Sequence, residues 1–484
     1  MDFLTQHFQQ TRRQFLTSSA SGAGAVALAT LLKQEGRLAA ESSLETASLV
    51  DPLRPRTSHF TARAKACIFI FLAGGTSQIE LFDPKPELTR LDGQRIPESF
   101  LKGVRFSFVK PTESFLMGSR FPFRRYGECG MEMSELLPHI GSCADELCLI
   151  RSLHHEAFDH APGELEMCTG KDIPGRPSLG AWLSYGLGSE SQNLPGYVVL
   201  MNHRGPVARQ MAWGSGFLPS VYQGVVFRNQ GEPILNLQTP DDITTTAHRS
   251  QLDAIRKLNQ LRQEQNHDPE VAARIAAYEL AFRMQTAAPE LIDLSHETRD
   301  TLTAYGVDRP NQQGTFSRNC LLARRLVERG VRVVSIFQRA WDQHKGLEGD
   351  LRKQCVEVDQ PIGALLKDLR QRGLLDSTLV VWGTEFGRTP LTENAKPGPD
   401  AGRDHHPHGF SMWLAGGGVK GGRVIGATDE LSWNAVTDRV HTNDFHATLL
   451  HLFGFDHKRL TYRFKGLDFR LTDVAGNVVD QILT

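Results

Sequence analysis

Residues 66–75 read Ala66-Cys67-Ile68-Phe69-Ile70-Phe71-Leu72-Ala73-Gly74-Gly75, an unbroken apolar run that stops at a glycine pair. Such a run without polar alternation is typical of a strand buried on both faces, as in a parallel sheet. The glycine pair then indicates a tight loop at the carboxyl end of the strand. This stretch therefore predicts the central element of an α/β fold.

Four later apolar segments predict strands of the same kind, at residues 147–150, 197–200, 331–336 and 377–383. Apolar positions at helical spacing predict amphipathic helices at residues 247–265, 270–287, 316–329 and 355–373, the last closed by Gly373. Strands that alternate with helices indicate an α/β fold with a mainly parallel sheet flanked by helices. The stretch from about 205 to 315 carries few strand signals and predicts a mostly helical insertion.

The N-terminus carries an export pattern. Thr11-Arg12-Arg13-Gln14-Phe15-Leu16 matches the twin-arginine consensus, and a small-residue site follows near Leu38-Ala39-Ala40. The alternative interpretation is a basic amphipathic helix, which the order of these features disfavours. We therefore expect a twin-arginine signal peptide at 1–40, a linker at 41–60, a domain at 61–484 and a periplasmic or secreted protein. The apolar run at 23–32 is too short for a stable membrane span.

Composition excludes some partners. Among the 484 residues, 54 Lys and Arg nearly balance 55 Asp and Glu, so no strong field favours nucleic acid. Seven cysteines without a CxxC pair are too few for a disulfide framework at this length. One or two disulfides among Cys129, Cys143 and Cys148 are an alternative to buried free thiols, which is the favoured interpretation for most cysteines.

Polar residues gather directly after the predicted strands. In sheets of this kind, ligands bind beyond the carboxyl ends of the strands. The candidates in these loops are Ser77, Asp159, His160, Asp342, His344, Glu385, Arg388, Asp404, His406 and His408. Their positions predict convergence on one cleft.

The residue types in these loops suit a divalent metal. Imidazole with carboxylate favours zinc or manganese, and carboxylates alone suit harder ions such as calcium. In Asp342-x-His344 both side chains lie on one side of an extended loop, because side chains alternate. By the same rule Asp404, His406 and His408 share a face and His405 lies on the other. A pair of metals there could hold an ester oxyanion.

The order of these clusters resembles the alkaline phosphatase and sulfatase superfamily, from about Lys65 to the C-terminus. Within it, the chain is similar to domain-of-unknown-function family 1501, whose members are twin-arginine-exported and sulfatase-related. Residues 445–454 resemble the superfamily helix Ala-Pro-Thr-Leu-Leu-x-Leu-x-Gly. The sequence motifs typical of the family are Phe82-Asp83-Pro84-Lys85-Pro86 and Glu385-Phe386-Gly387-Arg388-Thr389. The resemblance implies an alkaline phosphatase-like core.

The chain also departs from the superfamily pattern. Sulfatases place their nucleophile ten residues before a Thr-Gly, and that position here is His160, so a formylglycine precursor is missing. The Asp-His metal pair corresponds to Glu385-Phe386, and residues 74–77 replace the usual Asp pair. The late metal histidine corresponds to His406 or His408.

Three functions remain open. The first is a metal-dependent hydrolase of a phosphate, sulfate or related ester, in a small molecule or polysaccharide. Its expected ligands to zinc, manganese or calcium are Asp342, His344, Glu385, Asp404, His406 and His408. Its expected catalytic groups are His160 as acid/base or phosphoryl acceptor, Arg388 as anion partner and Ser77, unless Arg388 is a structural ion-pair partner and Ser77 a helix cap. The second is a non-catalytic binding or scaffold protein that keeps the fold. The third, a metal-dependent isomerase or mutase, suits an exported protein less well.

Overall fold

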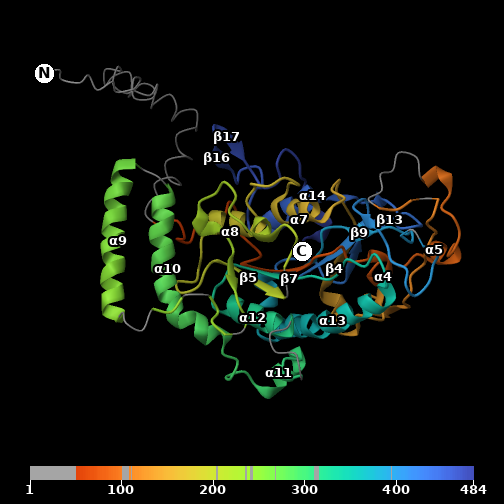
Figure 1. The fold of residues 1–484 in the computed structure, drawn as a ribbon, viewed down its shortest axis with the longest axis horizontal. Helices are drawn as coiled ribbons and strands as arrows, with labels where there is room; N and C mark the ends of the chain where they lie inside the picture. Colours follow the sequence, from red (N-terminus) through yellow and green to blue (C-terminus); the bar gives the residue numbers. More distant parts are fainter. Residues whose placement is uncertain are drawn as a thin grey trace.

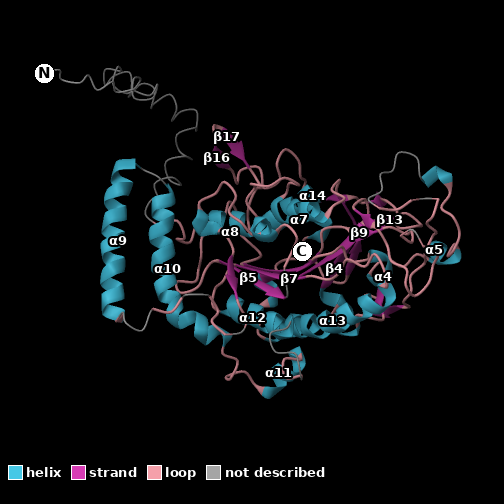
Figure 2. Ribbon diagram, in the orientation of Figure 1, coloured by secondary structure: helices cyan, strands magenta, loops and turns pink. Residues whose placement is uncertain are grey.

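The computed structural model describes residues 51–484 except 101–107, 111, 203–204, 230, 235–236, 240–243, 267–268, 310–315 and 394. The predicted signal peptide and most of the predicted linker therefore lie outside the described residues. The described chain builds a nine-stranded sheet between two helical layers (Figure 1; Figure 2). The strand order is β12-β4-β11-β8-β1-β7-β5-β6, with β15 paired to β4.

The strands of the sheet come from both ends of the chain. They are β1 (Ala66–Leu72), β4 (Leu147–His154), β5 (Tyr197–Asn202), β6 (Val225–Phe227), β7 (Val333–Gln338), β8 (Thr378–Gly383), β11 (Phe410–Ala415), β12 (Arg423–Ile425) and β15 (Val440–His441). β1 lies at the centre and pairs in parallel with β7 and β8. Only β11 among the described strands of this sheet runs antiparallel to its neighbours, β4 and β8. The predicted α/β class with a mainly parallel sheet is confirmed.

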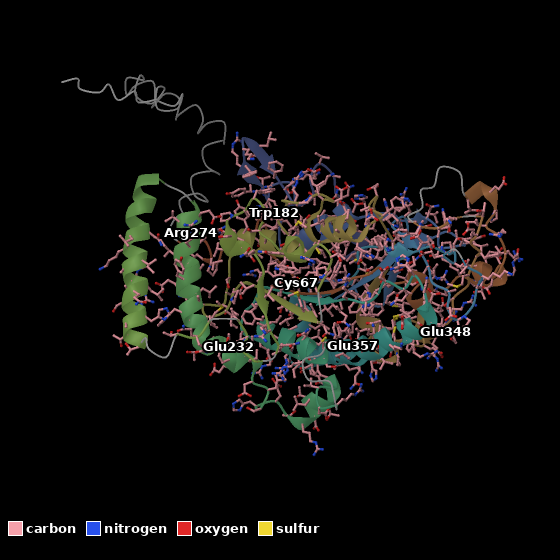
Figure 3. All side chains as sticks on the ribbon, viewed as in Figure 1. Cys67, Trp182, Glu232, Arg274, Glu348 and Glu357 are labelled. Carbon is pink, nitrogen blue, oxygen red and sulfur yellow. The ribbon has the colours of Figure 1, made fainter. Side chains whose placement is uncertain are left out.

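Alternation along β1 divides the core into two layers. Ile68 and Ile70 face one cluster of buried residues, whereas Cys67 and Phe69 face the other. The first layer is covered by α12 (Phe316–Glu328) and α13 (Leu347–Gln371), and the second by α7 (His160–Thr169), α8 (Leu179–Leu187) and α14 (Thr442–Leu452). Figure 3 shows side chains on both sides of the sheet, and Cys67, labelled near the middle of the view, is completely buried. The two-sided burial of β1 explains its unbroken apolar sequence.

Helix α13 begins eight residues before the predicted start at Cys355. Leu347 and Leu351 are buried and continue the spacing of four residues that ends at Cys355. The predicted boundary was late because polar residues separate these two leucines from the denser apolar pattern that follows.

The described part of the stretch from 205 to 315 carries three α-helices, α9 (Thr245–Asn266), α10 (Pro269–Ile292) and α11 (Arg299–Tyr305). α9 and α10 stand side by side at one end of the molecule (Figure 1). The short strand β6, which was not predicted, comes from the same stretch and adds an edge to the sheet beside β5.

The remaining α-helices and strand pairs of the described residues are short. They are the helices α4 (Gln78–Leu81), α5 (Pro86–Arg90) and α6 (Pro138–Gly141), and the strand pairs β2 (Phe123–Tyr126) with β3 (Met131–Ser134), β9 (Gly387–Arg388) with β10 (His405–His406), β13 (Ala427–Thr428) with β14 (Ala435–Thr437), and β16 (Tyr462–Phe464) with β17 (Leu467–Phe469). All seven cysteines are free thiols, and only Cys129 is exposed. Within the described residues, no helix combines the length and apolar character needed to cross a bilayer.

Candidate metal centre

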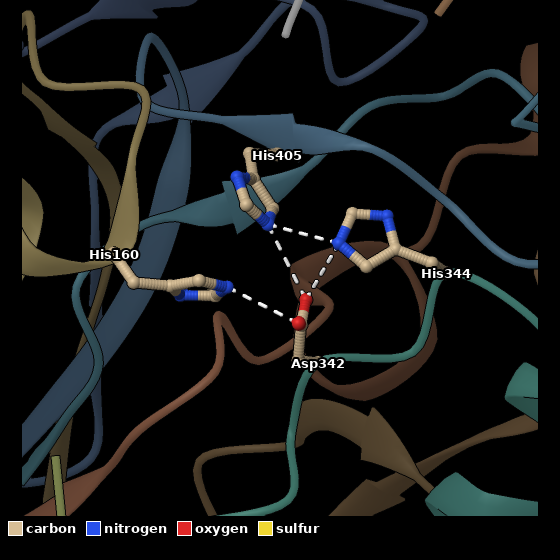
Figure 4. Close-up of side chains that lie close together, drawn as sticks. All are labelled: His160, Asp342, His344 and His405. Atoms are coloured by element: carbon tan, nitrogen blue, oxygen red, sulfur yellow. Dashed lines mark hydrogen bonds and ion pairs between the residues drawn. The ribbon is translucent and has the colours of Figure 1, made fainter. Parts of the chain in front are cut away.

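Three imidazoles and a carboxylate meet at the carboxyl edge of the sheet. His160, Asp342, His344 and His405, which we call the Asp342 cluster, each offer a ligand atom within 4.8 Å of the others (Figure 4). Asp342 Oδ1 lies 2.8 Å from His344 Nε2 and 3.3 Å from His405 Nε2. Its other oxygen, Oδ2, lies 3.2 Å from His160 Nε2. The two Nε2 atoms of His344 and His405 are 3.1 Å apart.

Parallel strands explain why residues so distant in sequence meet. His160 opens α7 in the loop that follows β4, and Asp342 and His344 follow β7. His405 lies on β10, which pairs with β9 just beyond the end of β8. The loops that follow parallel strands of one sheet share one edge, so the predicted convergence is observed for His160, Asp342 and His344, and His405 joins them.

Each imidazole of the Asp342 cluster is fixed through its other nitrogen. Nδ1 of His344 bonds to the Glu393 carboxylate, and Nδ1 of His405 lies 2.9 Å from the carbonyl oxygen of Phe158. Nδ1 of His160 lies 2.8 Å from Glu385 Oε1. Because these partners are acceptors, each Nδ1 carries the proton. In a neutral imidazole the Nε2 lone pair then points into the cluster, as in protein sites where an outer carboxylate or carbonyl orients a metal ligand.

The charges of the cluster are strongly coupled. Burial would raise the pKa of Asp342, but hydrogen bonds from His160, His344 and His405 and the charge of Arg388 hold it far below its usual range. Burial would lower the pKa of His160, but Asp342 and Glu385 outweigh it and raise the pKa to about 9. Asp342 and Glu393 likewise outweigh burial and raise the pKa of His344 to about 9. For His405 burial prevails and the pKa is lowered.

These residues fit a divalent metal. Zinc binds nitrogen and oxygen ligands at about 2.0–2.2 Å in tetrahedral geometry, so two ligands of one ion lie about 3.3 Å apart. Asp342 Oδ1, His344 Nε2 and His405 Nε2 are separated by 2.8, 3.1 and 3.3 Å. The Asp342 side chain is 41% exposed, so this trio opens to solvent. Three protein ligands with one open position are typical of catalytic zinc sites.

Arg388 lies behind the cluster and is completely buried. Its guanidinium donates to Asp342 Oδ1 at 2.7 Å and to the carbonyl oxygens of Gly74, Gly75, Trp341 and Arg403. The structure thus gives the alternative role foreseen for this residue, a structural ion-pair partner that orients Asp342. Contact with a substrate anion has no support in its position.

Glu385 is completely buried and lies one contact behind the trio. Besides His160, it accepts a hydrogen bond from the amide of Gly74 at 2.7 Å. Nearby, Glu164 accepts the amides of Val207 and Ala208, and burial followed by the charge of Glu385 raises the pKa of Glu164 to about 8. The position of Glu385 suits orientation of His160 better than the metal contact predicted from sequence.

In the loop at 404–408, His405 rather than His406 or His408 faces the Asp342 cluster, whereas Asp404 offers a ligand atom within 4.8 Å of His344 and Glu393, as a separate group. Side chains alternate as expected, but His405 points inward, and His406 Nε2 bonds to the carbonyl oxygen of Trp433. His408 packs near the ring of Phe158, outside the Asp342 cluster. The Asp404 carboxylate accepts three backbone amides, from Phe108, Val109 and His405. Pairing of β10 with β9 sets this orientation, and no local pattern in the sequence reports it.

Two other candidates lie apart from the imidazoles. Ser77 is buried and its hydroxyl donates to Glu80, which pairs with Arg403 at 2.7 Å. Asp159 is the exposed residue that precedes α7. Sequence reasoning missed His405 and Glu393. Glu393 follows the predicted Arg388 loop by only five residues, so its closeness to that loop was the available signal.

A second group, His154, Glu156 and His441, also offers ligand atoms within 4.8 Å of one another, and we call it the Glu156 cluster. His441 caps α14, and its Nδ1 accepts the amide of Asn443 at 3.1 Å. The proton of His441 is therefore on Nε2, which lies 3.3 Å from Glu156 Oε2. An arginine, Arg439, lies 3.5 Å from His154 Nδ1. A donor nitrogen and a neighbouring guanidinium both oppose a bound cation.

A family model matches residues 64–483, nearly the whole described chain, and its description is "Protein of unknown function (DUF1501)". The chain belongs to this family. The resemblance drawn from its motifs is thereby confirmed for the DUF1501 protein. No curated protein sequence matches it.

Solved structures similar to this DUF1501 protein are of low identity. One is the PsFucS1 sulfatase from Pseudoalteromonas sp., at 13% identity and a TM-score of 0.36, covering 81% of this chain and 68% of that one. Another is the phosphonate monoester hydrolase SpPMH from Silicibacter pomeroyi, at 12% and 0.33, covering 81% and 73%. A third is a protein in the alkaline phosphatase superfamily from Vibrio parahaemolyticus, at 10% and 0.34, covering 86% and 75%. At these scores the likenesses say nothing about activity.

Proposed function

We propose that this chain is an exported, metal-dependent hydrolase of phosphate, sulfate or related esters, in small molecules or polysaccharides. The observation that carries the proposal is the trio of Asp342, His344 and His405, whose ligand atoms lie 2.8–3.3 Å apart and open to solvent. These three residues would hold one zinc or manganese ion. When bound, such an ion supplies Lewis-acid polarisation of an ester oxygen and a water of lowered pKa.

His160 is the proposed acid/base group of this site. Its Nε2 lies 3.2 Å from Asp342 Oδ2, the carboxylate oxygen that His344 and His405 do not contact. Glu385 fixes its Nδ1. In the metal-free protein Asp342 and Glu385 raise the pKa of His160 to about 9, so the imidazole carries a proton at neutral pH. A protonated imidazole suits the general acid that protonates a departing alkoxide, a contribution of about 10²–10⁴-fold in rate.

The test separates metal binding from proton transfer. Wild-type protein isolated from the cytoplasm should contain about one metal ion per chain by elemental analysis. His405→Ala should lose that ion, whereas His160→Gln should keep it and lose rate. The loss in His160→Gln should be larger for methyl phosphate than for 4-nitrophenyl phosphate, because nitrophenolate departs without a proton. His154→Gln, in the Glu156 cluster, is the matched control and should behave as wild type.

Two results would contradict the proposal. Wild-type protein without stoichiometric metal would favour the scaffold alternative. A metal-loaded protein that turns over neither phosphate nor sulfate esters, with His160→Gln indistinguishable from wild type, would do the same.

Export is tested by itself. Arg12→Lys combined with Arg13→Lys should leave the precursor in the cytoplasm, because the paired arginines are the recognised feature of the signal. Normal arrival of this variant in the periplasm would contradict the export assignment and would leave the proposal of a metal site unaffected.

A further inference from the structure

An aromatic side chain stands at the mouth of the proposed metal centre. The ring centroid of Phe108 lies 5.7 Å from that of His344 and 6.0 Å from that of His405, edge to face in both cases. Phe108 is 54% exposed. Single exposed apolar residues are common and need no explanation, so exposure alone carries nothing. The position of this ring is distinctive because it packs against two of the three proposed ligands.

The two peptide N–H groups that flank the Cα atom of Phe108 are both held by hydrogen bonds. The buried carboxylate of Asp404 accepts the amide of Phe108 at 2.7 Å and that of Val109 at 2.9 Å. The side chain of Val109 is buried in an apolar cluster that includes Ile79 and Trp433. Asp404 also accepts the amide of His405 at 2.8 Å. One carboxylate therefore sets the position of the ring and of a proposed metal ligand together.

We infer that Phe108 forms a binding surface for the alcohol portion of the substrate, and that this portion carries a ring with an apolar face. The inference rests on the proposed function, because it needs an ester anion anchored at the metal. A pre-positioned aromatic ring loses little conformational freedom on binding, and it attracts the face of an aryl ring or the C–H face of a pyranose. The mixed environment fits such a substrate, with charge on the Asp342 cluster and apolar surface beside it.

Non-hydrolysable phosphonates test this inference without relying on turnover. Isothermal titration calorimetry on the full-length mature protein loaded with Zn²⁺ would compare methylphosphonate, phenylphosphonate and a glucosyl phosphonate. At least one ring-bearing probe should bind about 10-fold more tightly than methylphosphonate, since stacking on an aromatic side chain contributes about that much. The tighter of the two ring-bearing probes identifies the kind of ring.

Three variants make the test specific. Phe108→Ala should remove most of the ring preference and change methylphosphonate binding by less than about twofold, and Phe108→Tyr should restore it. Phe60 is the matched control because its ring also packs on an imidazole, that of His451 at 4.8 Å, and is 39% exposed. Phe60→Ala should behave as wild type, and zinc content should be equal in all variants.

The failures are distinguishable. If all three phosphonates bind wild type equally, or if Phe108→Ala keeps the ring preference, the role of Phe108 is overturned and the proposed function stands. If none of them binds the zinc-loaded protein, both are overturned.

Discussion

The Asp342 cluster and the Glu156 cluster contain similar residues but differ in where their protons lie. In the Asp342 cluster the Nδ1 atoms of His160, His344 and His405 all meet oxygen acceptors, so each imidazole in its neutral form keeps the Nε2 lone pair for a metal ion. In the Glu156 cluster His441 accepts a backbone amide at Nδ1, so its Nε2 is a donor. The difference shows that proximity of histidines and carboxylates does not define a metal site. The hydrogen bonds that set each tautomer decide it.

The surrounding charge differs in the same direction. The completely buried Arg388 donates to Asp342 Oδ1 at 2.7 Å, but its guanidinium also donates to four backbone carbonyl oxygens, which share its charge. At the Glu156 cluster Arg439 faces an imidazole nitrogen directly. The Glu156 side chain is 78% exposed, so water can hydrogen-bond to its carboxylate. A cation therefore gains more from the first cluster than from the second.

Metal-dependent stability should separate the clusters most strongly. Zinc at about 1,000 times its dissociation constant should stabilise the wild-type fold by about 4 kcal/mol, because a ligand of the folded state raises the free energy of unfolding. Asp342→Ala should abolish this increment, whereas Glu156→Ala should retain it. Denaturant unfolding with zinc and with chelator measures both. An equal loss in the two variants would contradict the assignment of the site.

The outer carboxylates should give the next largest difference. Glu393 and Glu156 each pair with one imidazole, but only Glu393 orients a proposed ligand. Glu393→Gln should weaken zinc binding about 10- to 100-fold, as loss of outer-shell partners typically does. Glu156→Gln is the matched control and should leave the affinity unchanged. Competition with a fluorescent zinc chelator reports both values, and equal affinities would remove Glu393 from the site.

The two clusters should also titrate in opposite directions. In metal-free protein the pKa of His160 and of His344 is raised to about 9, whereas burial and then Arg439 lower the pKa of His154 to about 4. A raised imidazole pKa stabilises the fold fully below the unfolded value of about 6.5, and the contribution is lost as pH rises through 9. A lowered pKa instead removes stability as pH falls from about 6.5 towards 4.

We therefore expect metal-free protein to lose about 1–2 kcal/mol of stability between pH 6.5 and 9.5, after allowing for the partial exposure of these side chains. Histidine resonances in NMR spectra would assign each titration. His160→Gln should remove one high-pH titration and part of the stability loss. Titration of His160 near 6.5 would show that Asp342 and Glu385 do not hold its proton.

The central strands of the sheet were predictable because a strand buried on both faces has an unbroken apolar sequence. Each of the five predicted strands lies in the sheet, and the apolar runs mark their positions to within a few residues at the amino ends. β6 was not predicted because an edge strand of three residues is too short to form a recognisable apolar run. β11 was not predicted either, although its six residues are all buried, because this short run contains a serine and directly follows the polar loop at 403–409.

The candidate site was only partly predictable. Strand order brought His160, Asp342 and His344 into one loop region, since parallel strands end at a common edge. The choice between His405 and His406 depended on which face of β10 turns inward, and this follows from its pairing with β9. The role of Arg388 depended on burial, because a guanidinium enclosed by backbone carbonyls cannot be told from an exposed one by sequence.

The smallest expected effect is the loss of stability when the helix cap formed by His441 is removed. If its Nδ1 serves α14 as a cap, His441→Ala should cost about 1 kcal/mol of stability, whether or not zinc is present. His441→Asn should recover most of that loss, because asparagine is a strong cap acceptor but a weak zinc ligand. Denaturant unfolding of both variants, with zinc and with chelator, measures the effect. A zinc-dependent loss in His441→Ala that asparagine does not repair would mean that the Glu156 cluster binds the metal, and the contrast drawn from the two tautomers would fail.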